Sequence, residues 1–242
     1  MWSSNKPLLF VAVFLVGITL LGCRPPASKE ALSQRRLAME RLGEYVSKIK
    51  PNSKILLLSN PFTKMKNASG EIKAFDQASL AGLENGLGKD HRIVVAYPKL
   101  SQSYLDHPET FTIPSNSKTP LSFILDTGSL DSLLAEHQDC QIIVSVIGLP
   151  VGITLTKAWK MNEVSFALLS PDLKVLGNRQ TALEAFKKDK ILAAVVQREG
   201  KDASNSILIT SDNIESILKD QPALLGYKER CLKNNFNNCA EA

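Results

Sequence analysis

Short apolar segments recur along this 242-residue chain and are separated by stretches with helical periodicity. Continuous apolar runs are typical of strands buried on both faces of a sheet. Runs of this kind occupy residues 54–59, 92–96, 141–147, 164–169 and 191–197. Helical patterns at 71–87, 129–137, 181–188 and 213–219 alternate with them. The alternation predicts an α/β fold with a Rossmann-like, mostly parallel sheet of five to six strands and helices on both faces.

The predicted single domain spans residues 51–225, and an N-terminal amphipathic helix at 29–50 precedes it. Ser28 is a suitable N-cap and Pro51 ends the helix. The apolar stripe of this helix must be buried against the domain, a partner helix or a lipid interface. Within the domain, residues 98–120 are rich in Ser, Pro, Thr and Asn and predict a long surface excursion. A short strand is expected at 121–125 and an edge strand at 206–210.

The formal net charge of +5 lies near the N-terminus. Residues 51–242 carry equal numbers of basic and acidic side chains, so the main domain is neutral. A protein that binds nucleic acid needs a basic stripe on its folded body, and this composition argues against one. The basic excess of the 29–50 helix would instead suit contact with anionic lipid.

Residues 1–22 have the features of a secretory leader. Lys6 precedes the apolar run LLFVAVFLVGITLL at 8–21, which is shorter than the roughly 20 residues of a membrane-spanning helix. The run ends in Leu20-Leu21-Gly22-Cys23, which resembles the lipobox of bacterial lipoproteins. That resemblance implies cleavage before Cys23, a diacylglycerol thioether on its sulfur, and acylation, such as palmitate, of the new amine. Residues 23–28 would then be the anchor and tether.

The resemblance to lipoproteins also implies a place in the cell envelope. Arg24 follows the lipobox cysteine, where many lipoproteins retained in the inner membrane have Asp. This favours the periplasmic face of the outer membrane where the host has one. Export fits the polar tail at 226–242, in which Cys231 and Cys239 would form a disulfide. A metal site is the alternative for this pair, although no His or third Cys accompanies it. Cys140, beside an apolar strand, is expected to be a buried free thiol.

Polar residues follow several predicted strands, where open parallel sheets bind ligands. The candidate ligand-binding residues are Asn60, Phe62, Gly148, Ser170 and Asp172. The segments LLLSNPF and DSLLAEHQDCQIIVSVIGLP resemble parts of one lobe of the type I periplasmic binding proteins. In that family, the Asn and the aromatic residue after the first strand touch the ligand, which nominates Asn60 and Phe62. The alternative interpretation is that Asn60 caps a turn and that Pro61 and Pro150 end strands.

The string LSFILDTGS at 121–129 resembles the active-site strand of aspartic proteases. By that resemblance Asp126 would activate water, but the mechanism needs two carboxylates and one DTG occurs in the chain. The alternative is that Asp126 caps the helix that follows. Gly82, Gly86, Gly88 and Lys89 do not have the spacing of a phosphate-binding loop. The three histidines are scattered, so neither a metal site nor a cofactor is expected.

These patterns predict a membrane-anchored extracytoplasmic lipoprotein that binds an unknown small ligand and is not an enzyme. The second hypothesis is an accessory lipoprotein of a cell-envelope complex, with an envelope protein as its partner. The third is a hydrolase that uses Asp126. A polar pocket at the strand ends would favour the first hypothesis. A filled crevice with exposed apolar residues would favour the second.

Overall fold

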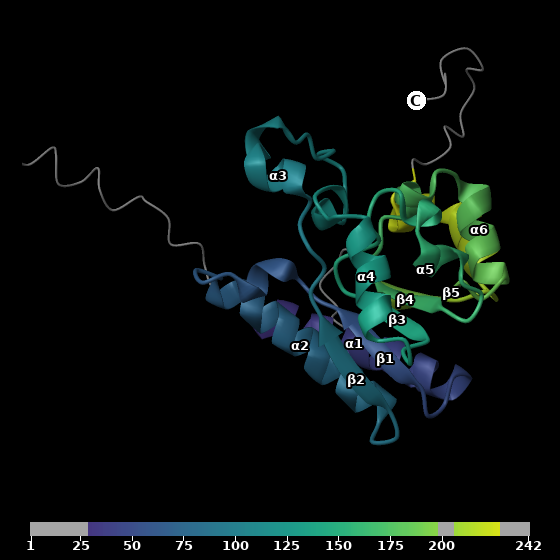
Figure 1. Ribbon diagram of the computed structural model, residues 1–242. Coiled ribbons are helices and arrows are strands. Elements are labelled where there is room, and N and C mark those ends of the chain that lie inside the picture. The colour runs from purple at the N-terminus through teal and green to yellow at the C-terminus, as the bar shows by residue number, and fades with distance from the viewer. Residues whose placement is uncertain (1–28, 198–205, 228–242) are drawn as a thin grey trace, which may run out of the picture.

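The computed structural model describes residues 29–197 and 206–227 (Figure 1). Its strands are β1 (Lys54–Leu58), β2 (Arg92–Ala96), β3 (Ile142–Ser145), β4 (Ser165–Leu169), β5 (Ile191–Gln197) and β6 (Ser206–Ile209). Its helices are α1 (Lys29–Ile49), α2 (Gly70–Leu87), α3 (Gln102–Asp106), α4 (Gly128–Glu136), α5 (Lys157–Lys160), α6 (Arg179–Lys187) and α7 (Ile214–Asp220).

The six strands form one sheet in the order β2-β1-β3-β4-β5-β6. Strands β1 to β5 are parallel, and β6 pairs antiparallel with β5 at the edge. The central strands β3 and β4 are buried along their whole length, as expected for strands covered on both faces. The predicted fold class, a mostly parallel α/β sheet, is therefore confirmed.

Helices cover both faces of the sheet. The chain runs from β1 to β2 in one direction and from β2 through β3, β4 and β5 in the other. Because parallel crossovers are right-handed, this reversal places α2 on one face and α4, α5 and α6 on the other. Helix α1 lies with α2 and crosses β4 and β5, and Figure 1 shows α4 and α6 on the opposite side.

The apolar stripe of α1 is buried on the domain itself. Met39, Leu42 and Val46 have no exposed surface, and the backbone of α1 lies directly against that of α2. Glycines make this approach possible. A Cβ atom at Gly43 would lie 2.9 Å from the carbonyl oxygen of Leu83, and one at Gly86 would overlap the carbonyl oxygen of Glu40. The first of the three expected docking surfaces for this helix is therefore the correct one.

The chain between β2 and α4 differs from its prediction in one respect. Residues 120–123 form a turn of 3-10 helix rather than part of a strand. The extended pairing is limited to a single antiparallel bridge between Leu100 and Leu125. Pro120 favours the first turn of a helix because its φ is already near the helical value. The strand expected at 121–125 was therefore wrong, while the surface excursion before it is present and contains α3.

Candidate functional site

The predicted site residues follow β1, β3 and β4 at the carboxyl edge of the sheet. Strand β1 lies between β2 and β3, and the direction of the chain reverses there. Such a switch point is where open α/β sheets most often bind ligands. The individual residues at this edge nevertheless have different surroundings, and these separate the candidates.

Asn60 lies in the turn after β1 and caps a short 3-10 helix, Pro61–Lys64. Its side-chain oxygen accepts a hydrogen bond from the backbone N–H of Phe62 at 3.0 Å. The alternative interpretation of Asn60 as a turn cap is therefore confirmed. Its side-chain amide nitrogen has no hydrogen-bond partner among the described residues, so it can still donate to a ligand. Phe62 is half-buried in the same turn.

Three side chains outside the predicted site residues lie at this end of β1 and β2. Asp76, in α2, accepts a hydrogen bond from the hydroxyl of Ser59, and its same oxygen lies 3.5 Å from the backbone nitrogen of Asn60. Tyr97 follows β2, whose last residue pairs in register with the last residue of β1. The ammonium of Lys64 lies 4.5 Å from the centre of the Tyr97 ring.

We refer to Asn60, Lys64, Asp76 and Tyr97 as the Asn60 cluster. Within the described part of the chain, the Tyr97 hydroxyl and the second carboxylate oxygen of Asp76 have no hydrogen-bond partner. The cluster thus presents donors and acceptors beside an aromatic ring at the ends of two adjacent strands. The parallel pairing of 54–58 with 92–96 could have nominated Tyr97. No sequence signal marks Asp76, which reaches the site from a helix.

The end of β3 is closed by the excursion. Gly148 adopts φ +83°, and a Cβ atom there would lie 2.6 Å from Cβ of Thr119 and 2.7 Å from the hydroxyl of Ser122. Thr119 and Ser122 are both buried and hydrogen-bonded to each other. A residue with a side chain at position 148 would therefore clash with Thr119 and Ser122. Because these residues fill the space around Gly148, no ligand can bind there.

Asp172 is also held by contacts within the domain. It is 1% exposed. Its carboxylate accepts hydrogen bonds from the backbone N–H groups of Lys174 and Lys118, at 3.2 and 3.4 Å, and lies 3.6 Å from the Lys174 ammonium. It thereby connects the turn after β4 to the excursion. Ser170, two residues earlier, adopts φ +44°, an uncommon conformation for a residue with a side chain, and is half-buried.

Asp126 lies in the turn that leads into α4. Its carboxylate accepts a hydrogen bond from the backbone N–H of Gly128, the first residue of α4, at 2.9 Å. Asp126 thus shapes the turn before the helix, while the N-cap residue itself is Thr127. Its own N–H donates to the carbonyl oxygen of Lys99. The described residues place no second carboxylate in hydrogen-bond contact with Asp126. The hydrolase hypothesis would therefore need a carboxylate from outside the described residues, in this chain or in another.

Arg35 of α1 reaches from the amphipathic helix to the same edge. Its Nε lies 2.5 Å from the hydroxyl of Ser79 and 3.1 Å from the carbonyl oxygen of Phe75, and its Nη2 lies 3.4 Å from the carbonyl oxygen of Val146. The pKa of Arg35 is lowered, because the effect of burial outweighs the opposing effect of the nearby Asp76 carboxylate, but the guanidinium remains charged at neutral pH. Arg35 thus points into the protein and is not available to lipid.

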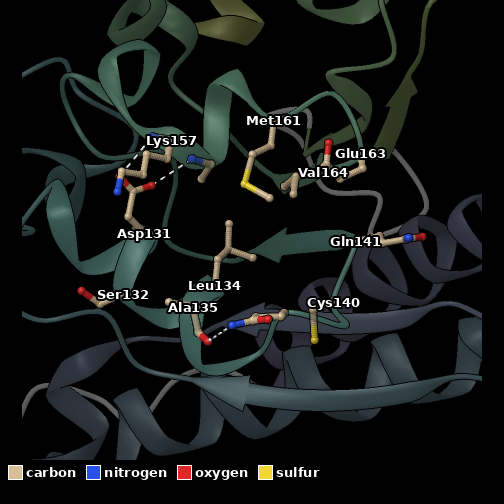
Figure 2. A pocket seen from close by; sticks show the side chains of 12 residues that line it. Asp131, Ser132, Leu134, Ala135, Cys140, Gln141, Lys157, Met161, Glu163 and Val164 are labelled. Carbon is tan, nitrogen blue, oxygen red and sulfur yellow. Dashed lines mark hydrogen bonds between the residues drawn. The ribbon is translucent and has the colours of Figure 1, made fainter.

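A separate cavity of about 580 Å³ lies between α4 and α5 (Figure 2). Leu134 and Met161 point into it from opposite sides. The Asp131 carboxylate closes one end, because it accepts hydrogen bonds from the backbone N–H groups of Lys157 and Ala158. Cys140 contributes to the lining and is buried as predicted; burial raises the pKa of its thiol. None of the predicted ligand-binding residues lines this cavity.

Cys23, Cys231 and Cys239 lie outside the described residues, as do the leader, the tether at 23–28 and nearly all of the tail at 226–242. Lipidation and the tail disulfide therefore remain predictions. In the part of the chain that the structure describes, no helix is both long and apolar enough to span a membrane.

No model of a known protein family matches this sequence, and no curated protein sequence matches it. Solved structures with a partly similar fold are solute-binding proteins of ABC transporters. One from Agrobacterium vitis, bound to α-D-tagatopyranose, has a TM-score of 0.48 and 12% identity over 81% of this chain. A glucose-galactose binding protein from Geobacillus stearothermophilus has a TM-score of 0.45 and 12% identity over 74% of this chain. This chain spans 62% and 61% of their respective lengths.

Proposed function

We propose that this chain is a lipid-anchored extracytoplasmic module that binds a small, hydroxyl-rich solute at the Asn60 cluster and catalyses no reaction. The supporting observation is the contrast along the carboxyl edge. At the ends of β3 and β4, Gly148 and Asp172 contact residues of the excursion and are therefore not free to bind a ligand. At β1 and β2, the Asn60 amide nitrogen, the Tyr97 hydroxyl and one Asp76 oxygen have no hydrogen-bond partner within the described residues.

Hydroxyl groups of a solute both donate and accept hydrogen bonds, so they need both kinds of protein group. The Asp76 carboxylate can only accept, the Asn60 amide nitrogen can only donate, and the Tyr97 hydroxyl can do both. Small-ligand sites usually combine apolar and aromatic side chains with a few polar groups that orient the ligand. The position of the cluster next to the switch point between β1 and β3 agrees with this proposal.

A thermal-shift screen of monosaccharides and polyols tests the proposal, followed by calorimetry on any ligand found. Asp76→Asn keeps an oxygen that can accept from Ser59, and Tyr97→Phe keeps the ring. We expect each variant to weaken binding at least ten-fold. Asp106→Asn and Tyr104→Phe, on the excursion, are the matched controls and should bind as wild type. If Ala135→Trp, which obstructs the α4–α5 cavity, weakens binding while the Asp76 and Tyr97 variants do not, the site is in the wrong place.

The anchor is the second part of the proposal. Cys23→Ser should remove the lipid and leave an unprocessed precursor, because the leader contains no other thiol. Intact mass measurement of the membrane-extracted protein checks this. The same measurement with and without alkylation tests the expected disulfide, since Cys231 and Cys239 should resist alkylation until they are reduced.

The accessory-lipoprotein hypothesis has its own supporting observation. The excursion fills the edge above β3, and the next segment exposes apolar side chains: Leu155 is 75% exposed and Val151 is 45% exposed. A protein partner would cover them. A photo-crosslinker at position 155 in living cells would then yield one discrete adduct, whereas a crosslinker at position 49 would yield none.

A further inference from the structure

Helix α1 begins at the carboxyl edge of the sheet. Arg35 contacts the carbonyl oxygen of Val146, the first residue after β3, and that of Phe75 in the second turn of α2. At its other end α1 leads into β1, so it runs antiparallel to the strands. Lys29 precedes Arg35 by six residues, which places it roughly 9 Å farther out along the helix. The chain therefore enters the domain on the side where the strands end.

This direction matters for an anchored protein, and the inference rests on the lipidation of Cys23 proposed above. Five residues separate Cys23 from Lys29. Even fully extended, this segment spans only about 20 Å. A lipid on Cys23 would therefore hold the carboxyl edge of the sheet closer to the bilayer than the amino edge.

Exposed apolar side chains are concentrated on that same side. Eight large hydrophobic residues are exposed in the described part of the chain. Ile49 and Met161 lie at the amino edge, next to the starts of β1 and β4. The other six lie on the first half of α1 or in segments that follow the ends of β1, β2 and β3; these are Leu37, Met65, Leu105, Ile113, Val151 and Leu155.

The most prominent of these segments is the arm, which we define as residues 101–114. It contains α3 and stands off from the body of the domain beyond the end of β2 (Figure 1). Its base is fixed by the Leu100–Leu125 bridge and by the hydrogen bond from Ser101 N–H to the carbonyl oxygen of Ile124. Leu105 is 51% exposed and Ile113 is 36% exposed on its surface. The rings of Tyr104 and Phe111, both partly buried, pack edge-to-face with their centres 5.6 Å apart.

We propose that the arm is a second membrane contact, with Leu105 and Ile113 inserted among the lipid headgroups and the carboxyl edge of the sheet turned towards the bilayer. Apolar side chains are stabilised at this depth, and together with an acyl anchor they fix an orientation that the anchor alone leaves free. The partner in this proposal is the lipid surface itself. The arm carries Asp106 and Glu109 and no Lys or Arg, so its apolar side chains, and not an attraction to anionic lipid, would hold it on a zwitterionic surface.

The experiment uses the full chain, purified with its lipid and placed in phosphatidylcholine nanodiscs that contain a diazirine-labelled phospholipid. Intact mass first establishes whether Cys23 carries diacylglycerol. After illumination, peptide mapping locates the lipid adducts. We expect adducts on residues 101–114 to exceed those on residues 47–53 and 157–163 at least five-fold. Leu105→Ser with Ile113→Ser should reduce adducts on the arm at least three-fold, whereas Ile49→Ser with Met161→Ser should leave them unchanged.

The outcomes separate the two proposals. If Cys23 carries the lipid but adducts are spread evenly or gather at the amino edge, the membrane contact of the arm is overturned and the anchor stands. If the arm reacts equally in wild type and in the Leu105 and Ile113 variant, insertion of these side chains is overturned as well. If Cys23 carries no lipid, the proposed anchoring fails, and the orientation inferred from it fails too. Circular dichroism checks that both double variants are folded.

Discussion

The backbone carbonyl oxygen of Arg36 occupies the space that a Cβ atom at Gly82 would need. The same relationship holds one turn later between Glu40 and Gly86. Helices α1 and α2 therefore touch through their backbones, and this close approach lets α1 reach across to β4 and β5. The amphipathic helix is thus an integral part of the domain, packed on it through its apolar stripe.

Gly82→Ala should destabilise the protein by about 2–4 kcal/mol, because the added methyl group forces two packed helix backbones apart. Gly70→Ala is the matched control: Gly70 is the first residue of α2, and a Cβ atom there has no neighbour within 4 Å. The control should change stability by less than about 1 kcal/mol. Urea denaturation followed by circular dichroism measures both. Equal stability of the two variants would contradict the close packing of α1 on α2.

Arg35→Met should destabilise the protein by about 2–4 kcal/mol. Methionine preserves an unbranched apolar stem, but it leaves the hydroxyl of Ser79 and the carbonyl oxygens of Phe75 and Val146 without their charged donor. Lys48→Met is the control on the exposed face of the same helix. We expect a change of less than about 0.5 kcal/mol there. Similar small effects at both positions would mean that the hydrogen bonds of Arg35 contribute no more to stability than an exposed side chain does.

Most of the sheet could be predicted from the sequence because a strand buried on both faces leaves a continuous apolar run. Strands β2 and β5 were predicted with their observed bounds, 92–96 and 191–197. Helix α5 was missed because four residues are too few to show a helical period. Its N-cap is Thr156, whose hydroxyl accepts a hydrogen bond from the backbone N–H of Trp159, and that capping residue was the available signal.

The candidate site was less accessible to sequence reasoning. Asn60 and Phe62 could be nominated because they directly follow an apolar run. The closure of Gly148 by Thr119 and Ser122 could not be predicted, since it depends on where a polar excursion folds back in space. The same holds for Asp76, which is 16 residues from Asn60 and faces it only because α2 returns along β1. The spacing of Gly82 and Gly86 says nothing of their role in helix packing, which depends on the position of α1.

The ionisation of Tyr227 should make the stability of the folded protein depend on pH in the alkaline range. It is buried, and its hydroxyl lies 2.8 Å from the carbonyl oxygen of Leu173 and 3.0 Å from that of Asn178. Burial, with a further contribution from Asp172, raises the pKa of Tyr227 well above its ordinary value. The unfolded chain therefore loses this proton near pH 10 while the folded chain keeps it, so stability falls as the pH rises through that range.

The corresponding variant is Tyr227→Phe. At neutral pH it should lose about 1 kcal/mol, because one buried hydrogen bond is removed. Between pH 10 and 11 the stability of the variant should fall less steeply than that of wild type, by up to about 1.4 kcal/mol per pH unit for the one proton involved. Urea titrations of both proteins at pH 8, 10 and 11 provide the comparison. Parallel curves over the whole range would show that this tyrosine ionises as readily when folded as when unfolded.

Substitutions at Asp172 test whether this predicted site residue stabilises the turn after β4 or contacts a ligand. Asp172→Ala should destabilise the protein by about 2–4 kcal/mol, because it leaves the part-buried N–H groups of Lys118 and Lys174 without their acceptor and removes a buried side chain. Asp172→Asn keeps one acceptor oxygen and should recover about half of that loss. Hydrogen exchange should report faster amide exchange around Lys118 in both variants, since this carboxylate ties the excursion to the turn after β4. If Asp172→Ala instead keeps wild-type stability and loses affinity for a bound solute, the ligand site extends to β4 and the Asn60 cluster is only part of it.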